Sequence, residues 1–176
     1  MRIDEPERAM CYGKAVVLCL GNKYRKDDAA GIRVADKLLQ MDLGEGVVVE
    51  SCQSADLSLL SSYGGADRVI IVDALRSDAT PGTVSRYDMT PARSRVRSLP
   101  GSHSIRLHDM FDIAHQSGLL SCPVTIFGIE PKDTGLGEGI SPEVEGVIPR
   151  VLTMVIRELN LEPGPPPSKP KVPKRA

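Results

Sequence analysis

Three places in this sequence carry side chains that could bind a divalent metal. An acidic pair, Asp27 and Asp28, follows the first apolar run, Asp73 stands at the end of another, and His103 precedes a helical pattern. Two carboxylates and one imidazole from three separate loops can bind a divalent metal and leave coordination positions open. Open positions are what a catalytic or substrate-sensing metal requires, because substrate or water must reach the ion.

Each of these positions also has a simpler interpretation when it is taken alone. Asp27 or Asp28 could cap a helix or interact favourably with the helix dipole. Asp73 could close its strand by accepting hydrogen bonds from backbone amides, and a single loop histidine such as His103 is more often solvated. Spacing alone therefore does not decide between a metal site and structural roles. It also leaves open whether Asp27 orients a water molecule or caps the helix.

Three other groups of residues are weaker candidates for chemistry. His108 and His115 are seven residues apart, so they share one helix face, and we expect them to pack there rather than join the site. The glycine-rich stretch 135–139 lacks the Lys-Ser/Thr pair of a phosphate-binding loop and does not directly follow a strand, which predicts a flexible loop. The three arginines within 93–97 indicate a solvated loop or a lip on which a peptide docks.

The elements that must position these residues are predicted from the apolar pattern. Short apolar runs indicate buried strands, and apolar residues at helical spacing indicate helices. Strands are predicted at 15–20, 47–49, 68–74 and 124–129, with a further candidate at 83–87. Helices are predicted at 29–41, 55–63, 105–116 and 142–159. In the last helix, Ser141 is the expected N-cap, and Pro149 is expected to interrupt and kink the helix.

Strands that alternate with helices predict an α/β fold, a three-layer α/β/α domain with a mostly parallel sheet. In such folds ligands bind at the carboxyl ends of the strands, and the acidic pair, Asp73 and His103 are expected there. The single α/β domain is predicted to span 14–161. A loose extension at 1–13 precedes it, and a Pro/Lys-rich disordered tail at 162–176 follows it.

Charge and aromatic content argue against a nucleic-acid partner. Lys and Arg number 22, Asp and Glu 23, and the net charge is −1. Four basic residues within 169–175 carry +4, so the rest of the chain carries −5 (−1 minus 4). Aromatic residues make up only 3% of the chain and Trp is absent, which disfavours a surface on which bases stack.

Cysteine usage and apolar run length indicate a cytoplasmic protein with no membrane partner. The four cysteines form no C-x-x-C pair, and we expect all of them to be reduced. No run approaches the roughly 18 apolar residues of a membrane span. Acidic residues precede the first apolar stretch, which is not the pattern of a signal peptide.

The order of short motifs resembles one family, the NiFe-hydrogenase maturation endopeptidases. A strand with Gly-Asn and an acidic pair stands at 20–28, an aspartate that ends a strand at 69–74, and a Pro-Gly-Thr strand start at 81–83. A Ser-His element follows at 102–103, a Gly-Ile-Glu-Pro turn at 128–131 and a Ser-Pro helix start at 141–144. The resemblance runs from about Val16 to Leu159.

This resemblance implies a fold, a site and a reaction. The family fold is a five-stranded sheet between helices with one antiparallel strand, for which 83–87 is the candidate. Asp28, Asp73 and His103 match the family's metal ligands, and the metal it implies is nickel, a divalent ion supplied by the substrate. The implied reaction removes a C-terminal extension from the NiFe-hydrogenase large-subunit precursor after nickel insertion. We expect a monomeric protease.

Other functions compete with this one. The first is a metal-sensing chaperone or checkpoint protein that binds the precursor without cleaving it, and the second is a hydrolase of the same fold with other substrates. Two departures from the family pattern also bear on function. Cys19 replaces a glycine before Gly21-Asn22, and Ser51-Cys52-Gln53 replaces the Asp-Gly-Gly that many members carry after the second strand. The second departure concerns the substrate-facing surface, and hence which hydrogenase the protein serves.

Overall fold

The computed structural model describes residues 15–89 and 102–159, and the side chains of the second range from residue 109 onward. Five strands form one sheet in the order β2-β1-β3-β5-β4. They are β1 (Ala15–Leu20), β2 (Val47–Cys52), β3 (Arg68–Ala74), β4 (Val84–Met89) and β5 (Val124–Ile129). Among them, β4 alone is antiparallel to its neighbour. The mostly parallel sheet and its antiparallel strand are therefore confirmed.

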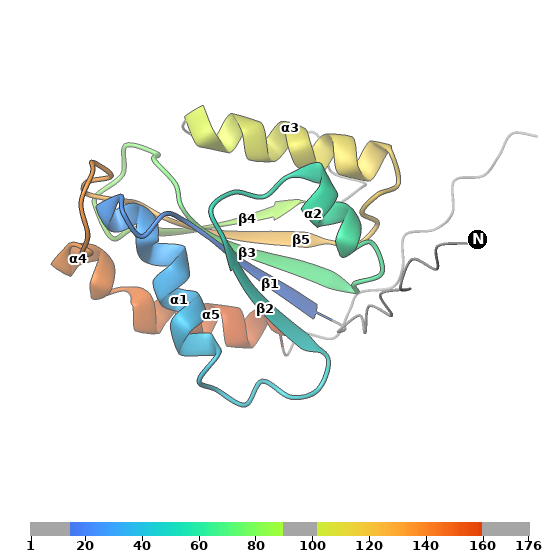
Figure 1. The fold of residues 1–176 in the computed structure, drawn as a ribbon, viewed down its shortest axis with the longest axis horizontal. Helices are drawn as coiled ribbons and strands as arrows, with labels where there is room; N and C mark the ends of the chain where they lie inside the picture. The colour runs from blue at the N-terminus through green and yellow to red at the C-terminus, as the bar shows by residue number, and fades with distance from the viewer. Residues whose placement is uncertain (1–14, 90–101, 160–176) are drawn as a thin grey trace, which may run out of the picture.

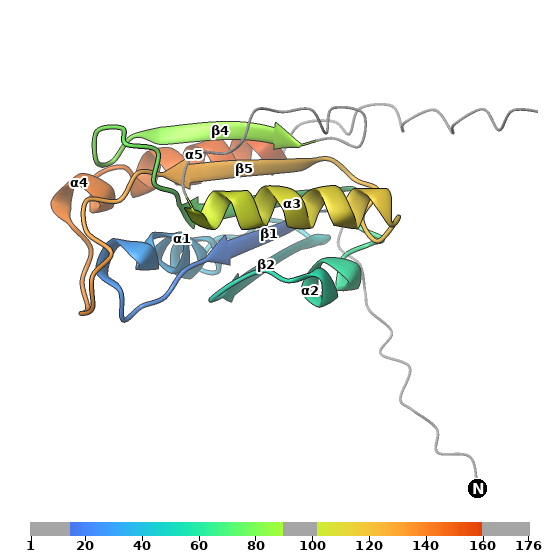
Figure 2. The same cartoon turned by 90° about the horizontal axis from the view of Figure 1, so that it is seen from above.

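Helices cover both faces of this sheet and complete the three predicted layers (Figures 1 and 2). The helical segments are η1 (Lys26–Ala29), α1 (Ala30–Leu38), α2 (Leu57–Ser62), α3 (Ser102–Gln116), α4 (Pro142–Glu145) and α5 (Ile148–Leu159). In Figure 1, α2 and α3 lie on one side of the sheet, and α1 and α5 lie on the other.

Two apolar clusters bury the two faces of the sheet. On one face, Leu60 of α2 and Phe111 of α3 pack against alternate residues of the central strands. On the other face, Val34 of α1 and Val151 of α5 pack against the remaining ones. Every residue of β1 and of β5 is buried. Strands covered on both sides have continuous apolar sequences, which is why these two were predicted at their observed bounds.

The termini of several helices differ from the predicted ones. The predicted helix at 29–41 is shorter, because the chain first forms the single turn η1 and α1 ends at Leu38. The predicted helix at 142–159 is two helices, α4 and α5. The interruption expected at Pro149 is therefore present, but it is a break just before this proline, which is the second residue of α5, and not a kink within one helix. Proline is tolerated there because the first turn of a helix has no acceptors for its N–H groups.

Several predictions concern residues outside the described ranges and stay predictions. They are the extension at 1–13, the tail at 162–176 and the arginine cluster at 93–97. Cys19, Cys52 and Cys122 are free thiols, as expected, and Cys11 lies outside the described residues. Among the helices that the structure describes, none is long and apolar enough to cross a membrane.

Candidate active site

The carboxyl ends of the parallel strands bring Asp28 and Asp73 together. Asp73 is the penultimate residue of β3, and Asp28 lies in η1, which follows β1. Because β1 and β3 are adjacent and parallel, the segments that leave them begin at the same edge of the sheet. The negative charge of Asp28 is one of the causes that raise the pKa of Asp73, so the two carboxylates are electrostatic neighbours.

Asp73 is a buried carboxylate with few hydrogen bonds. It is 9% exposed, and its Oδ1 accepts a bond of 2.8 Å from the backbone N–H of Ala74. Burial, helped by the charge of Asp28 and opposed by the bond from Ala74, raises the pKa of Asp73 to about 7. Such a carboxylate is stabilised in its charged form by a cation, and it is therefore suited to bind one.

Two glycines allow η1 and α1 to approach the strand ends closely. A Cβ atom on Gly21 would lie 2.0 Å from the backbone oxygen of Asp28, and the φ of Gly21 is +153°. A Cβ atom on Gly31 would lie 2.1 Å from the oxygen of Leu20 and 2.8 Å from that of Val72. Only glycine fits at either position. The Gly-Asn motif and the glycine after the acidic pair therefore set where Asp28 lies.

Asp27 has a different role from its neighbour. It is 1% exposed, and its Oδ2 accepts bonds from the backbone N–H groups of Lys132 and Asp133 at 2.8 and 2.9 Å. The backbone N–H and the hydroxyl of Ser141 donate to Oδ1 and Oδ2 at 2.6 and 3.0 Å. Burial alone would raise the pKa of Asp27, but these hydrogen bonds outweigh it and lower the pKa.

These contacts bear on the question that the sequence left open. Three of the four bonds end on Oδ2 and one ends on Oδ1, so protein donors occupy most of the acceptor positions of this carboxylate. No side chain caps η1 or α1, so Asp27 is not a helix N-cap. Asp27 instead fastens the loop 130–141 to η1. The hydroxyl of Ser141, the expected N-cap of α4, makes no capping bond because it donates to Asp27.

Glu130 is a second buried carboxylate that organises a loop at this edge. It is 6% exposed, and its Oε2 accepts bonds from the backbone N–H and the hydroxyl of Ser77 at 2.7 and 2.5 Å. Its backbone oxygen also accepts a bond of 2.8 Å from the N–H of Gly82. Glu130 thereby holds the segment that follows Asp73. Sequence reasoning quoted Glu130 within a motif but assigned it no role. The signal in the sequence that could have identified Glu130 was an acidic residue directly after a predicted buried strand.

His103 occupies the first turn of α3 rather than the predicted loop, because the helix begins at Ser102. Figures 1 and 2 show that α3 begins at the edge where β5 ends, which is also the edge of Asp73. The side chain of His103 lies outside the described residues. Among the side chains that are described, no group of three His, Cys, Asp or Glu could hold a metal. The structure thus brings together two of the three residues that were predicted to be ligands, Asp28 and Asp73.

The other histidine whose side chain is described does not belong to this site. His115 is near the end of α3, and its Nε2 lies 3.2 Å from the backbone oxygen of Cys122. Burial lowers the pKa of His115. It joins the helix to the segment before β5, consistent with the packing role expected from its place on the helix face.

The fold and the site together define an α/β/α protein with an acidic site at the carboxyl edge of its sheet. A family model described as hydrogenase maturation protease (HycI) matches residues 32–158. The match contains Asp73 and His103 and begins after Asp28. It covers well over half of the chain, and the chain therefore belongs to the hydrogenase maturation protease family, whose members are hydrolases.

Individual relatives agree with this assignment. The hydrogenase 2 maturation protease of Escherichia coli is 29% identical over 150 residues, which are 83% of this chain and 90% of the relative. The hydrogenase expression/formation protein HupD of Rhizobium leguminosarum is 25% identical over 150 residues, which are 83% of this chain and 74% of the relative.

Solved structures show the same fold. The hydrogenase maturating endopeptidase HybD from E. coli superposes with a TM-score of 0.67 and 27% identity, over 84% of this chain and 94% of that one. A hydrogenase 2 maturation peptidase from a Thaumarchaeota archaeon superposes with a TM-score of 0.65 and 25% identity, over 84% and 99%.

Proposed function

We propose that this protein removes a C-terminal extension from the large-subunit precursor of a NiFe hydrogenase after nickel has been inserted. Family membership supports the protease class. The observation that supports a nickel-loaded substrate is the buried carboxylate of Asp73. Within the described residues, this carboxylate accepts one hydrogen bond, which comes from its neighbour Ala74. A buried carboxylate in this state favours a cation, which the nickel of the loaded precursor would supply.

In this proposal Asp28, Asp73 and His103 bind the nickel carried by the substrate. Nickel bound near a peptide carbonyl polarises it or activates a water molecule. Water adds to the carbonyl carbon and the C–N bond breaks, which leaves a carboxylate on the subunit and an amine on the released peptide. These three residues hold the nickel-containing part of the precursor at the carboxyl edge of the sheet. The contacts of Asp27 and Glu130 keep the surrounding loops in place.

The test is incubation of the protein with a matched large-subunit precursor, with and without nickel, followed by mass spectrometry of the precursor. We expect the nickel-loaded form to lose the mass of its C-terminal extension and the nickel-free form to remain intact. A matched nickel-loaded precursor that keeps its full mass contradicts the proposal. A stable complex without mass loss would instead establish a checkpoint protein that binds without cleaving.

The role of His103 has its own control. We expect His103→Ala to abolish cleavage of the nickel-loaded precursor, while His115→Ala, on the same helix but outside the site, keeps it. Full activity of the His103→Ala variant would remove this residue from the metal site. Circular dichroism of both variants separates a lost ligand from a lost fold.

A further inference from the structure

The glycine-rich stretch 135–139 presents one large apolar side chain to solvent. Leu136 is 84% exposed, more than any other large apolar residue that the structure describes. The stretch is neither a phosphate loop nor part of the candidate metal site. Its position is nevertheless close to that site, because it belongs to the same loop 130–141 that Asp27 fastens to η1.

Contacts on both sides of Leu136 hold this loop in one conformation. On one side, the backbone N–H of Gly135 donates to Oδ1 of Asp133 at 2.8 Å, and Asp133 forms an ion pair with Lys26. On the other side, Gly137 donates to the backbone oxygen of Tyr24 and accepts from the N–H of Lys26, both at 2.9 Å. Leu136 thus projects from a braced loop, and little conformational entropy remains to be lost when a partner covers it.

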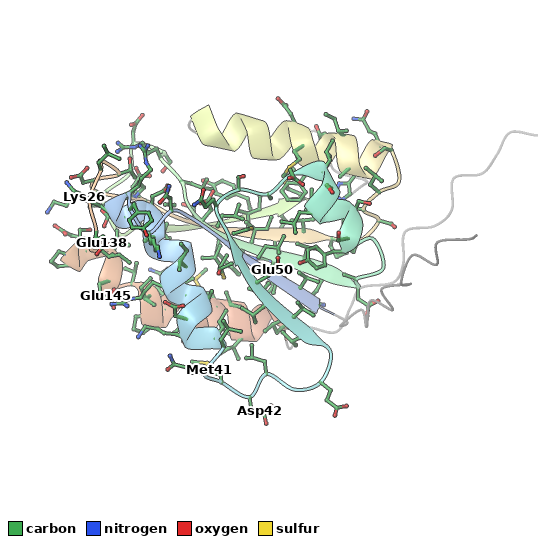
Figure 3. All side chains as sticks on the ribbon, in the orientation of Figure 1. Lys26, Met41, Asp42, Glu50, Glu138 and Glu145 are labelled. Atoms are coloured by element: carbon green, nitrogen blue, oxygen red, sulfur yellow. The ribbon has the colours of Figure 1, made fainter. Side chains whose placement is uncertain are left out.

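The pairing also brings the backbone of a second exposed residue with a large apolar side chain next to that of Leu136. Arg25 and Gly137 form an isolated parallel bridge, so the preceding residues, Tyr24 and Leu136, are neighbours across it. Tyr24 is 53% exposed, and the ammonium group of Lys23 lies 4.9 Å from the centre of its ring. We call Tyr24 and Leu136 the apolar knob. It stands on the segment that leads from β1 to Asp28, and Figure 3 shows its neighbours Lys26 and Glu138 together at that end of the molecule.

We propose that the apolar knob docks an apolar surface of the hydrogenase large-subunit precursor next to the segment to be cleaved. This inference rests on the proposed function, because it names a contact of the same substrate. A protease whose substrate is a protein must hold that protein around its site, and residues at the rim make those contacts. Tyrosine is a residue type that is enriched at binding hot spots, and the braced backbone holds Leu136 ready to add apolar contact area beside it.

The chemistry of the knob favours a protein surface over a small ligand. Its two residues are exposed beside the bridge and offer apolar area, with the cations Lys23 and Arg25 and the carboxylate of Glu138 exposed around them. A partner that fits this arrangement has an apolar patch bordered by charged groups of both signs. In contrast, Asp28 is partly buried and Asp73 is buried. The metal site and the apolar knob would therefore contact different parts of the same precursor.

The experiment compares Leu136→Asp with Leu39→Asp. Leu39 is also exposed, at 64%, and follows the far end of α1, where Figure 3 labels Met41. With nickel-loaded precursor as substrate, we expect Leu136→Asp to raise KM by about tenfold or more and to leave kcat unchanged. Leu39→Asp and the apolar replacement Leu136→Met are expected to keep the KM of the unaltered protein. Thermal unfolding checks that both charged variants remain folded.

The outcomes separate this proposal from the function on which it rests. An unchanged KM for Leu136→Asp, or an equal rise for Leu39→Asp, overturns the docking role while cleavage by the unaltered protein upholds the proposed function. If the unaltered protein binds the precursor without cleaving it, the same comparison is made on Kd by calorimetry, where a weakened Leu136→Asp supports the knob. A protein that neither binds nor cleaves the loaded precursor overturns both.

Discussion

Two buried aspartates at the same edge of the sheet, Asp27 and Asp73, have opposite surroundings. Asp27 is 1% exposed and accepts four hydrogen bonds, from Lys132, Asp133 and Ser141. Asp73 is 9% exposed, and the described residues give it one, from the adjacent Ala74. The pKa of Asp27 is lowered by its donors, whereas burial raises the pKa of Asp73 to about 7.

The difference supports the proposed roles, Asp73 as a metal ligand and Asp27 as a residue that holds the loops around the site. A charge that accepts four hydrogen bonds is stabilised by the protein itself and gains little from a further ligand. A buried charge without such donors is costly in the free protein and gains when a cation binds. Both residues are buried carboxyls, and the number of donors and the neighbouring charge of Asp28 distinguish their surroundings.

The largest expected effect is on activity, at Asp73. Asp73→Asn keeps the size of the side chain and removes the charge that would bind nickel. Since a metal contributes several kcal/mol of transition-state stabilisation, we expect cleavage of loaded precursor to fall by about a hundredfold or more. Single-turnover cleavage, with the exposed Asp36→Asn on α1 as control, measures it. Activity within a few fold of the unaltered protein would contradict a ligand role for Asp73.

A large effect on stability is expected at Asp27. In Asp27→Asn an amide NH2 group takes the place of one of the two carboxylate oxygens. Because this group donates rather than accepts, the backbone N–H groups that faced that oxygen are left unpaired. We expect a loss of about 3 kcal/mol in the free energy of unfolding, measured by urea denaturation. The lowered pKa of Asp27 means that its contribution is present above about pH 4 and lost as pH falls through the folded pKa. The unaltered protein and Asp27→Asn should therefore converge in acid.

The two aspartates should have opposite effects on the pH dependence of stability. The pKa of Asp73 is raised in the folded state to about 7, so between about pH 4 and pH 7 the folded protein retains a proton that the unfolded chain has released. Stability of the metal-free protein should fall over this interval by on the order of a few kcal/mol relative to Asp73→Asn. Urea denaturation of both proteins at several pH values measures this. Parallel curves would show that Asp73 is not perturbed.

The smallest expected effect concerns a single donor to Asp27. Ser141→Ala removes the hydroxyl that donates at 3.0 Å and keeps the backbone N–H that donates at 2.6 Å. We expect a loss of about 1.5 kcal/mol, the usual range for one hydrogen bond to a charged group. Ser117→Ala, which removes a hydroxyl bonded within its own helix, is the matched control. A loss as large as that of Asp27→Asn would mean that Asp27 acts mainly through Ser141.

Much of the fold was predictable because its central strands are buried on both faces. β1, β3 and β5 have continuous apolar sequences, and their predicted bounds agree with the structure. The edge strand β2 was predicted too short, because its last residues, such as Glu50, are polar and only partly buried. The interruption near Pro149 was expected, but its position before the proline was not, since Val144, Val147 and Ile148 continue one apolar stripe across the break. The spacing of apolar residues indicates which face of a helix is buried, but it does not indicate where the helical hydrogen bonding ends.

The sequence by itself determined the order of strands and helices, the family resemblance and the positions of the acids, because these depend on local residue types and their spacing. Only the tertiary structure showed how the surroundings of Asp27 and Asp28 differ. The donors to the carboxylate of Asp27 come from residues more than 100 positions away, at 132, 133 and 141. Two adjacent aspartates look alike in sequence, and long-range contacts give them different environments. The same contacts brace the loop of Leu136, which the sequence alone predicted to be flexible.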